Sequence, residues 1–323
     1  MRDITKRFGS VVANDRVWLD IYRGEVLALL GENGSGKTTL MNMLSGIYFP
    51  DEGQILIDGE EVVIRSPRDA YRYGIGMIHQ HFKLVDVFTA AENITLGLDE
   101  KLDLKATAAR IRSICERYGF DLDPNQKIYD MSVSQKQTVE IVKALYRGAD
   151  ILILDEPTAV LTPQEIDELM ATMKEFAREG KSILFISHKL NEIMAVADRV
   201  TVLRKGRCIG TVNTCDTNKQ ELSNMMVGRP VQLVIDKTQA RPGEEILHVE
   251  DLCVLSHLHK RNAVDHVSFS VRAGEIVCIA GIDGNGQTEL IHGLTGLDKI
   301  TGGSVTLCGE TITHASILSL IHI

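Results

Sequence analysis

The sequence predicts an α/β fold with a parallel sheet, and three observations lead to that expectation. The apolar runs VLALL, ILILD and SILFIS have the character of strands buried on both faces. Helical spacing of apolar residues alternates with those runs, and strands that alternate with helices form parallel sheets. A glycine-rich loop, GENGSGKT, separates the first run from a helix that begins at Lys37. The predicted strands lie in Val26–Leu30, 149–157 and 182–187, and the predicted helices span 106–119, 134–147 and 163–179.

Shorter elements are predicted around that core. Alternation over 17–21 predicts a half-buried strand, and PDEGQILIDGEEV (50–62) predicts a turn, a short strand and an Asp-Gly hairpin turn. Residues 200–203 and 208–212 predict a β-pair closed by a Lys-Gly turn. The polar segment 231–245 contains Pro-Gly and is typical of an interdomain linker.

The glycine-rich loop at 31–38 predicts a phosphate-binding site. Its glycines let backbone N–H groups surround phosphate oxygens, and the helix N-terminus adds positive potential. Lys37 can reach the β- and γ-phosphates, and the Thr38 hydroxyl can hold Mg²⁺. The alternative is a glycine-rich turn without a ligand. The strand–loop–helix setting favours a site for a nucleoside triphosphate.

Polar residues follow three other apolar runs. Asp155 and Glu156 end the ILILDE strand, where one carboxylate can orient Mg²⁺ and the other can polarise a water. Paired carboxylates at a strand end are common on surfaces, but the preceding GxxxxGKT loop makes hydrolysis the better interpretation. His188 follows the next strand and Gln80 follows a shorter run, at the sheet edge where such folds bind ligands. A lone histidine is otherwise more often structural.

The first part of the chain recurs in the second part. GEVLALLGENGSGKTTLMNMLSG, from Gly24, corresponds without a gap to GEIVCIAGIDGNGQTELIHGLTG, from Gly274. At the decisive position Lys37 is matched by Gln287. Because a neutral amide cannot balance the charge of a triphosphate, we expect the second loop to bind weakly or without turnover.

Composition limits the classes of protein. The length of 323 residues allows about two domains. A net charge of −9 and the lack of a basic cluster argue against nucleic acid as a partner. The six cysteines form no CxxC pair and show no metal-ligand spacing, so we expect reduced, mostly structural thiols in a cytosolic protein. The sequence contains no apolar run of about 18 residues and no signal peptide.

The segment MSVSQKQTVEIVKAL (131–145) predicts a helix that begins at Ser132. A hydroxyl beside free backbone N–H groups can form a second anion site. The alternative is an ordinary serine-capped helix, which this segment alone favours.

Five motifs of the chain resemble those of the ATP-binding subunit of ABC transporters in their order and spacing. They are the loop at 31–38, Gln80, the MSVSQ segment, LDEPTAVLT and ISH. The match covers about 1–230 thoroughly and 246–316 as a partial second copy. EPTAVLTPQE, MIHQHFKLV and the degenerate DGNGQTEL are most similar to tandem-domain importers of simple sugars and nucleosides, the nucleoside branch being nearest in wording.

The resemblance implies the roles of individual residues. It implies that Glu156, His188 and Gln80 are catalytic. It also implies that Thr38, Gln80 and Asp155 bind Mg²⁺. The signature segment, which contacts the nucleotide of the opposite domain, is Ser132, Val133, Ser134 and Gln135. ATP is bound by an adenine-stacking Phe8 and by Gly31, Glu32, Asn33, Gly34, Ser35, Gly36, Lys37, Thr38 and Thr39.

The resemblance also implies an architecture. A P-loop NTPase of the ABC type has a RecA-like core, an antiparallel β subdomain and a helical subdomain. We expect one such domain at 1–232, a linker at 233–245, and the N-terminal part of a degenerate second copy at 246–323. Two such domains pack head to tail, each nucleotide lying between one P-loop and the other domain's signature helix.

Departures from the family pattern gather on one composite site. Ser134 stands where the family usually has glycine, Gln287 replaces the P-loop lysine of the second copy, and Leu258 replaces its stacking aromatic. One active and one impaired site is the expected result. The chain finishes in SILSLIHI and opens inside the expected first strand, so we expect a truncated or frame-shifted product of a longer protein.

The expected function is ATP hydrolysis that powers import, as a peripheral protein on the cytoplasmic face of the cell membrane. The implied partners are membrane-embedded permease subunits, an extracytoplasmic substrate-binding protein and, by self-association, other ATPase domains, but no nucleic acid. The apolar segment 81–87 is the candidate docking site for a permease, the alternative being a surface loop. Two rival functions remain: a soluble tandem ATPase that acts on ribosomes, and a nucleotide-binding fragment without turnover.

Overall fold

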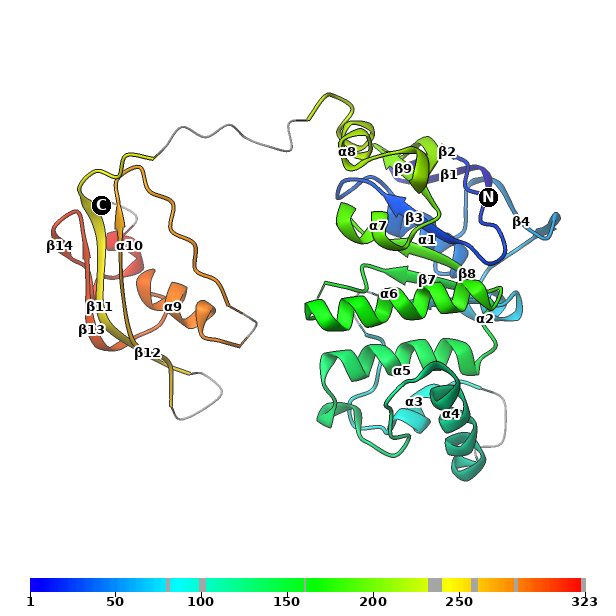
Figure 1. Ribbon diagram of the computed structural model, residues 1–323, viewed down its shortest axis with the longest axis horizontal. Helices are drawn as coiled ribbons and strands as arrows, with labels where there is room; N and C mark the ends of the chain where they lie inside the picture. The colour runs from blue at the N-terminus through cyan, green and yellow to red at the C-terminus, as the bar shows by residue number, and fades with distance from the viewer. Residues whose placement is uncertain are drawn as a thin grey trace. The chain divides into compact units, whose positions relative to one another are not determined.

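The structure is a computed structural model, and it describes residues 1–79, 82–98, 103–159, 161–231, 240–256, 261–281 and 284–320 (Figure 1). The chain divides into two compact units, Met1–Leu233 and Val234–Ile323, and each is described by itself. Residues 233–239 of the predicted linker, 233–245, lie outside the described residues.

A six-stranded sheet forms the centre of the first unit. The strand order is β10-β9-β3-β8-β7-β6, with β10 antiparallel to β9 and the remaining neighbours parallel. The predicted α/β fold with a parallel sheet is therefore confirmed. Its strands are β3 (Val26–Leu30), β6 (Ile75–Ile78), β7 (Ile151–Asp155), β8 (Ser182–Ile186), β9 (Arg199–Arg204) and β10 (Arg207–Asn213).

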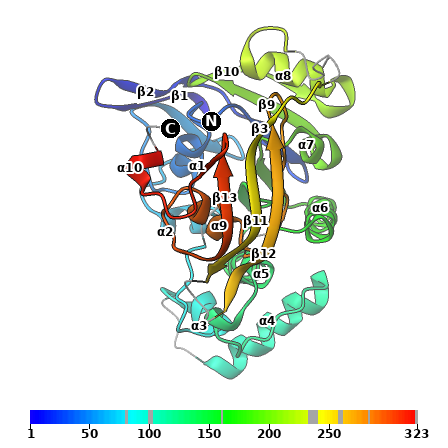
Figure 2. The same cartoon turned by 90° about the vertical axis from the view of Figure 1, so that its left-hand side faces the viewer.

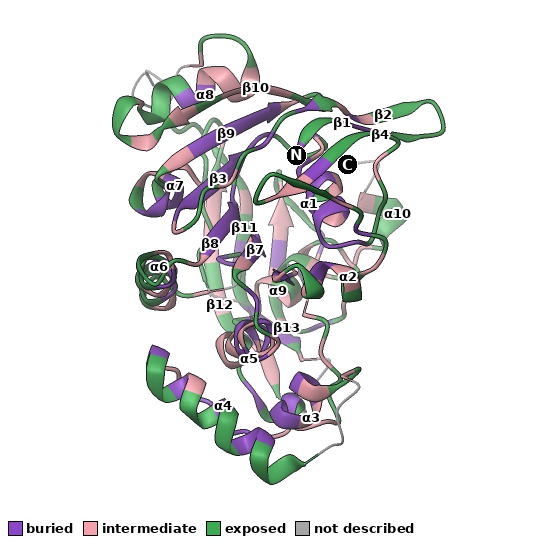
Figure 3. Ribbon diagram, turned by 90° about the vertical axis from the view of Figure 1, so that its right-hand side faces the viewer, coloured by how far each residue is buried: buried purple, intermediate pink, exposed green. Residues whose placement is uncertain are grey.

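The apolar runs of the sequence are buried on both faces of this sheet (Figure 3). Alternate residues of β3 face opposite cores, since successive side chains of a strand point to opposite sides. Val26, Ala28 and Leu30 belong to the core that α6 (Pro163–Arg178) covers. Leu27 and Leu29 belong to the core shared with α1 (Lys37–Leu44) and the antiparallel sheet. Burial on both faces is why these strands read as continuous apolar runs rather than alternating ones.

Helices cover the sheet and build a separate helical part. The three predicted helices are confirmed as α4 (Leu104–Tyr118), α5 (Val133–Tyr146) and α6 (Pro163–Arg178). Residues of α3, α4 and α5 share their own apolar core. No helix within the described residues is both long and apolar enough to cross a membrane. The other helical segments of the unit are α1 (Lys37–Leu44), α2 (Pro67–Arg72), α3 (Ala90–Thr95), η1 (Ile128–Asp130), α7 (Leu190–Val196), η2 (Thr214–Asp216) and α8 (Lys219–Val227).

A second, antiparallel sheet of order β2-β1-β4-β5 completes the unit. The predicted strand at 17–21 is wrong, because β2 ends at Val17 and its partner β1 begins at Arg2. Beyond β2, Leu19 exchanges hydrogen bonds with Met1, its N–H donating to the Met1 carbonyl oxygen and its carbonyl oxygen accepting from the Met1 amino group. Its side chain is buried, as the alternation indicated. The strands are β1 (Arg2–Phe8), β2 (Val11–Val17), β4 (Glu52–Ile57) and β5 (Glu60–Val62).

The second unit contains one antiparallel sheet of order β12-β11-β13-β14, in which the long strands β11, β12 and β13 run side by side (Figure 2). This order corresponds element by element to β2-β1-β4-β5 of the first unit. A core that includes Val249, Leu252 and Leu290 lies between this sheet and α9. The elements are β11 (Glu245–Leu255), β12 (Asn262–Arg272), α9 (Gln287–Leu294), β13 (Ile300–Leu307), β14 (Glu310–Thr311) and α10 (Ile317–Leu320).

One apolar segment of the second unit forms no strand. Residues 276–280 correspond in the sequence repeat to β3, yet their backbone is irregular and Ile276 is 89% exposed. In the first unit β3 lies between β8 and β9, which supply hydrogen-bond partners on both sides. The described part of the second unit has no such neighbours, so the same pattern does not become a strand.

Candidate active site

The glycine-rich loop connects β3 to α1 and takes a conformation that side chains would prevent. Gly36, the N-cap of α1, has φ +96°, and Gly34 has φ +78°. A Cβ on Gly36 would overlap the Ala13 carbonyl oxygen, and one on Gly31 would overlap the Leu203 carbonyl oxygen. The loop is therefore held tightly against β2 and β9, and its backbone N–H groups are available at the start of α1.

Lys37 is buried inside this loop. Its Nζ donates to the carbonyl oxygens of Gly31 at 2.7 Å and Glu32 at 3.0 Å. Burial lowers the pKa of Lys37, while Glu156 and Asp155 act in the opposite direction. Both carboxylates therefore act electrostatically on the Lys37 ammonium group.

The two carboxylates lie at the carboxyl end of β7. Burial raises the pKa of Asp155, Glu156 adds to that rise, and Lys37 opposes it. Glu156 has φ +47°, a left-handed conformation in which its N–H donates to the Ile186 carbonyl oxygen of β8 at 3.0 Å. Its Oε1 lies 3.2 Å from Nδ1 of His188. The loops after β7 and β8 therefore bring a carboxylate and an imidazole together.

A cleft of about 640 Å³ collects most of these groups. A larger cavity of about 780 Å³ begins at the opposite ends of β7 and β8, where Asp150 and Ser182 lie, and it contains no phosphate-binding loop. The smaller cleft is therefore identified as the candidate site by its phosphate-binding loop and carboxylates, and not by its volume. The cleft is lined by Val11, Val12, Ala13, Asn33, Gly34, Gly36, Lys37, Thr38, Thr39, Asp155, Glu156, Lys205 and Gly206.

Several residues singled out from the sequence do not line this cleft, among them His188 and the loop residues Gly31, Glu32 and Ser35. Phe8 is 43% exposed at the end of β1, where its ring packs edge-on against Tyr48 with centroids 5.2 Å apart. Ser132 is the N-cap of α5 and forms a capping box with Gln135, so its hydroxyl already accepts a backbone N–H. Gln80 lies outside the described residues.

Sequence reasoning missed several residues of the site. Val11, Val12 and Ala13 of β2 and the Lys205-Gly206 turn line the cleft, yet no motif marks them. Asn14 donates from Nδ2 to the Gly36 carbonyl oxygen at 3.2 Å and so supports the loop. Only the tertiary packing of the antiparallel sheet and of the β9–β10 turn against the loop brings these residues to the site.

A buried carboxylate contact fixes the turn after Glu156. Glu192 of α7, which is 8% exposed, accepts hydrogen bonds from Thr158 at 2.7 Å and Ser187 at 3.0 Å. Lys189 lies 3.0 Å from the other carboxylate oxygen of Glu192 and also donates to the Thr158 carbonyl. This network links the segments that carry Glu156 and His188, although neither pattern nor spacing indicated it.

The site as built fits a nucleotide with Mg²⁺. Ser35 Oγ is buried in the loop and has no hydrogen-bond partner, as expected for a group that a phosphate satisfies. The Thr38 hydroxyl and the Asp155 carboxylate are oxygen ligands of the kind Mg²⁺ prefers. With a parallel sheet, a glycine-rich loop at a helix N-terminus and carboxylates after a neighbouring strand, the first unit is a P-loop NTPase domain.

Comparison with known proteins specifies the class. Residues 14–159 match the family model described as ABC transporter. The chain is 53% identical to the nucleoside import ATP-binding protein NupA of Lactococcus lactis subsp. cremoris over 97% of this chain and 63% of that protein. It is 52% identical to the guanosine import ATP-binding protein NupO of Bacillus subtilis, over 97% and 62%. The chain thus spans less than two thirds of the length of these relatives.

Solved structures give the same fold. An ABC transporter ATP-binding cassette in its ADP conformation superposes with a TM-score of 0.61 at 25% identity, covering 70% of this chain and 93% of that one. The cbiO1 component of an ABC transporter from Clostridium perfringens gives 0.60 at 27%, covering 70% and 92%. Residues 14–159 thus match the ABC transporter family model, and the first unit has the fold of an ABC ATP-binding cassette. ABC ATPase domains bind ATP with Mg²⁺ as a general property of the fold.

Proposed function

We propose that this chain is the ATP-binding and ATP-hydrolysing part of an importer of nucleosides or simple sugars. The observation that carries the proposal is the convergence of Lys37, Asp155 and Glu156 on one cleft, with His188 in contact with Glu156. Phosphoryl transfer needs little beyond positioning and charge stabilisation, and this cleft provides groups for both.

In this proposal each group has one task. Lys37 exchanges the Gly31 and Glu32 carbonyls for phosphate oxygens, and the loop N–H groups hold the remaining oxygens. Thr38 and Asp155 hold Mg²⁺, which neutralises developing charge when bound. Glu156 takes a hydrogen bond from the attacking water, and His188, beside it, stabilises the charge that develops. Gln80, assigned to metal and water, lies outside the described residues.

We further propose that the second unit is the N-terminal part of a degenerate second ATPase domain. The first domain would then span 1–232, the linker 233–245 and the second domain 246–323. Support comes from matched positions in the two units. Gly286 has φ +86° and would meet the Ala263 carbonyl, as Gly36 meets that of Ala13. The side chain of Gln287 lies against Gly281, the glycine that corresponds to Gly31. An amide at this position leaves the second loop without its cation.

The cargo and the partners follow from the relatives rather than from the site. The relatives named above import nucleosides and guanosine, and others at 43–44% identity are named for glucose and ribose import. We infer permease subunits, a substrate-binding protein and a peripheral position at the cytoplasmic membrane face. The segment that we propose to dock against a permease subunit is 81–87. Val85 and Val87 are 36% and 65% exposed, and Asn93 fixes the backbone of Val85 through hydrogen bonds in both directions.

The second candidate is nucleotide binding without turnover by this chain alone. It is favoured by the position of the signature segment, because Ser132 to Gln135 do not line the cleft of their own unit. In the head-to-tail arrangement implied by the family, a signature must arrive from another domain. A second copy of the chain can supply one, since each copy carries MSVSQ.

The deciding experiment measures Mg²⁺-ATP hydrolysis per chain over a wide range of protein concentration. If two chains pair, activity per chain rises with concentration and then saturates, because the composite site forms only in the pair. Constant activity per chain contradicts pairing. ATP binding with no hydrolysis at any concentration contradicts turnover and leaves the second candidate.

The role of Ser132 is tested by comparing two helix caps that form the same kind of capping box. Thr162 caps α6 with the same capping box that Ser132 makes on α5. Replacing either cap by alanine should lower the free energy of unfolding by about 1 kcal/mol, measured by urea denaturation. If the Ser132 hydroxyl also contacts a nucleotide across the pair, only Ser132→Ala lowers hydrolysis by more than about tenfold. Equal losses in both variants would reduce Ser132 to an ordinary cap.

A further inference from the structure

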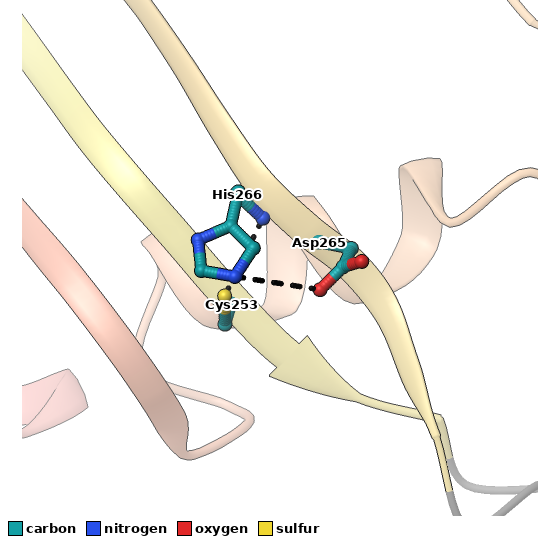
Figure 4. A group of neighbouring side chains, drawn as sticks. All are labelled: Cys253, Asp265 and His266. Atoms are coloured by element: carbon teal, nitrogen blue, oxygen red, sulfur yellow. Dashed lines mark hydrogen bonds and ion pairs between the residues drawn. The ribbon is translucent and has the colours of Figure 1, made fainter.

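Three side chains with different donor atoms gather at the pairing of β11 and β12 in the second unit. Sγ of Cys253, a ring nitrogen of His266 and a carboxylate oxygen of Asp265 all lie within 4.8 Å of one another. Figure 4 shows the ring nitrogen Nε2 directed at both the sulfur and the carboxylate, with Nε2 4.0 Å from Oδ1 of Asp265. Thiolate, imidazole and carboxylate are the donors that Zn²⁺ takes in proteins.

A fourth residue orients the imidazole. Nδ1 of His266 lies 2.8 Å from Oδ1 of Asp251, which leaves Nε2 facing Cys253 and Asp265. In metal sites a carboxylate commonly holds one imidazole nitrogen and directs the other at the ion. Asp251 and His266 therefore have the relation of an orienting residue and a metal ligand.

The backbone explains why consecutive residues converge. Asp265 and His266 are neighbours in β12 and would face opposite sides of a regular strand. The pairing register of β11 with β12 shifts on both sides of Leu252, and His266 has φ +53°. This bulge turns both side chains toward Cys253. Sγ of Cys253 is fixed there, because it accepts the His266 backbone N–H at 3.4 Å.

The first unit contains the same bulge but lacks two of the three metal-binding donors. Arg16, which corresponds to His266, has φ +48°, and its N–H donates to the Thr5 hydroxyl at 3.2 Å. Thr5 corresponds to Cys253, since each follows the residue that pairs with Val17 or Val267. The bulge is thus a feature of the sheet that forms without an ion. What distinguishes the second unit is cysteine in place of threonine and histidine in place of arginine.

We propose that Cys253, Asp265 and His266 form a site for one Zn²⁺ ion, with water completing the coordination and Asp251 orienting His266. Donors of a tetrahedral zinc site stand about 3.5 Å apart, so shifts of about 1 Å bring the three together. Asp265 and His266 are largely exposed and free to make that shift. Binding releases the thiol proton of Cys253 to solvent, forms the zinc–sulfur bond and links β11 to β12. The proposal is independent of ATP hydrolysis.

The test is a Co²⁺ titration of the full chain with saturating Mg²⁺ and a reductant that contains no thiol. Co²⁺ replaces Zn²⁺ and reports a cysteine ligand through a thiolate-to-cobalt absorption band. We expect a band that saturates at one Co²⁺ per chain and is abolished when Zn²⁺ displaces the cobalt. No thiolate band, or one without saturation, overturns the proposal.

Matched variants locate the band. Cys253→Thr restores the residue of the first bulge, whose hydroxyl accepts the same N–H, and it should abolish the band. Cys278→Ser removes an exposed thiol of the same unit and should leave the band unchanged. Asp251→Asn should keep the band but weaken affinity about 10- to 100-fold, which a purely structural role of Asp251 would not do. A band that survives in Cys253→Thr, or is lost in Cys278→Ser, overturns the assignment.

If circular dichroism shows that Cys253→Thr disturbs the sheet, His266→Arg gives the same answer. Arginine occupies this position in the first bulge, so the backbone accepts it. The affinity of the His266→Arg variant for Co²⁺ should fall by at least about 100-fold, since a ligand rather than an orienting residue is lost. Unchanged affinity in a folded His266→Arg chain contradicts the site.

Discussion

Glu156→Gln is expected to lower ATP hydrolysis by about 10²- to 10⁴-fold while leaving ATP affinity within about twofold. Glutamine keeps the shape of the side chain and can accept a hydrogen bond from the water, but its amide oxygen is too weakly basic to take the proton of that water. The left-handed backbone at Glu156 is the same strain for both residues, and the contact with the Ile186 carbonyl involves only the backbone. Hydrolysis is measured by phosphate release at a protein concentration where the unmodified chain turns over, and affinity by equilibrium binding.

The matched control for that variant is Glu168→Gln. Glu168 is an exposed glutamate of α6, so the same chemical change there should leave both hydrolysis and binding unaltered. The role given to Glu156 fails if Glu156→Gln keeps more than about half of the activity. It also fails if the loss is entirely in ATP affinity, because Glu156 would then serve binding rather than the chemical step.

Phe185→Ala is expected to lower the free energy of unfolding of the first unit by about 3–5 kcal/mol. Phe185 lies on β8 with no exposed surface, in the core that joins the sheet to α6. Truncation removes its burial and leaves a cavity that the parallel strands on either side cannot close. Urea unfolding without nucleotide measures the change as a shift of midpoint at constant slope.

Phe49→Ala is the control for this core variant. Phe49 is 51% exposed, so truncation there should cost less than about 1 kcal/mol. Because the chain has two units, the transition of the first unit is identified as the one that ATP with Mg²⁺ moves to higher urea. Similar losses in both variants would contradict the packing described for β8.

The sequence alone was sufficient to predict those parts of the site whose chemistry follows from local sequence and secondary structure. The loop at 31–38 could be predicted to bind phosphate because its glycines, its lysine and the following helix are local in sequence. Asp155 and His188 could be expected near the loop because parallel strands deliver their carboxyl ends to one edge of a sheet. The three long helices and the buried strands could also be predicted from the sequence. A helix buried on one face shows apolar residues with a period of 3.6, and a strand buried on both faces is a continuous apolar run.

Other features depended on neighbours that no local pattern encodes. The alternation at 17–21 is real burial, but a strand also needs a partner, and β1 supplies one only as far as Val17. The run at 276–280 repeats the pattern of β3 and still forms no strand, because the described second unit offers no parallel neighbours. The six cysteines showed no metal-ligand spacing, since the donors around Cys253 are brought together by a bulge between two strands.

The amino-acid sequence by itself determined the phosphate-binding type of the loop at 31–38 and the parallel α/β core, and it predicted a second, similar loop with Gln287 in place of Lys37. Only the tertiary structure decided which residues line the cleft, and that cysteine, histidine and aspartate meet in the second unit. Periodicity and motifs report each segment's own burial and chemistry, whereas a cleft or a ligand set arises from segments that only packing brings into contact.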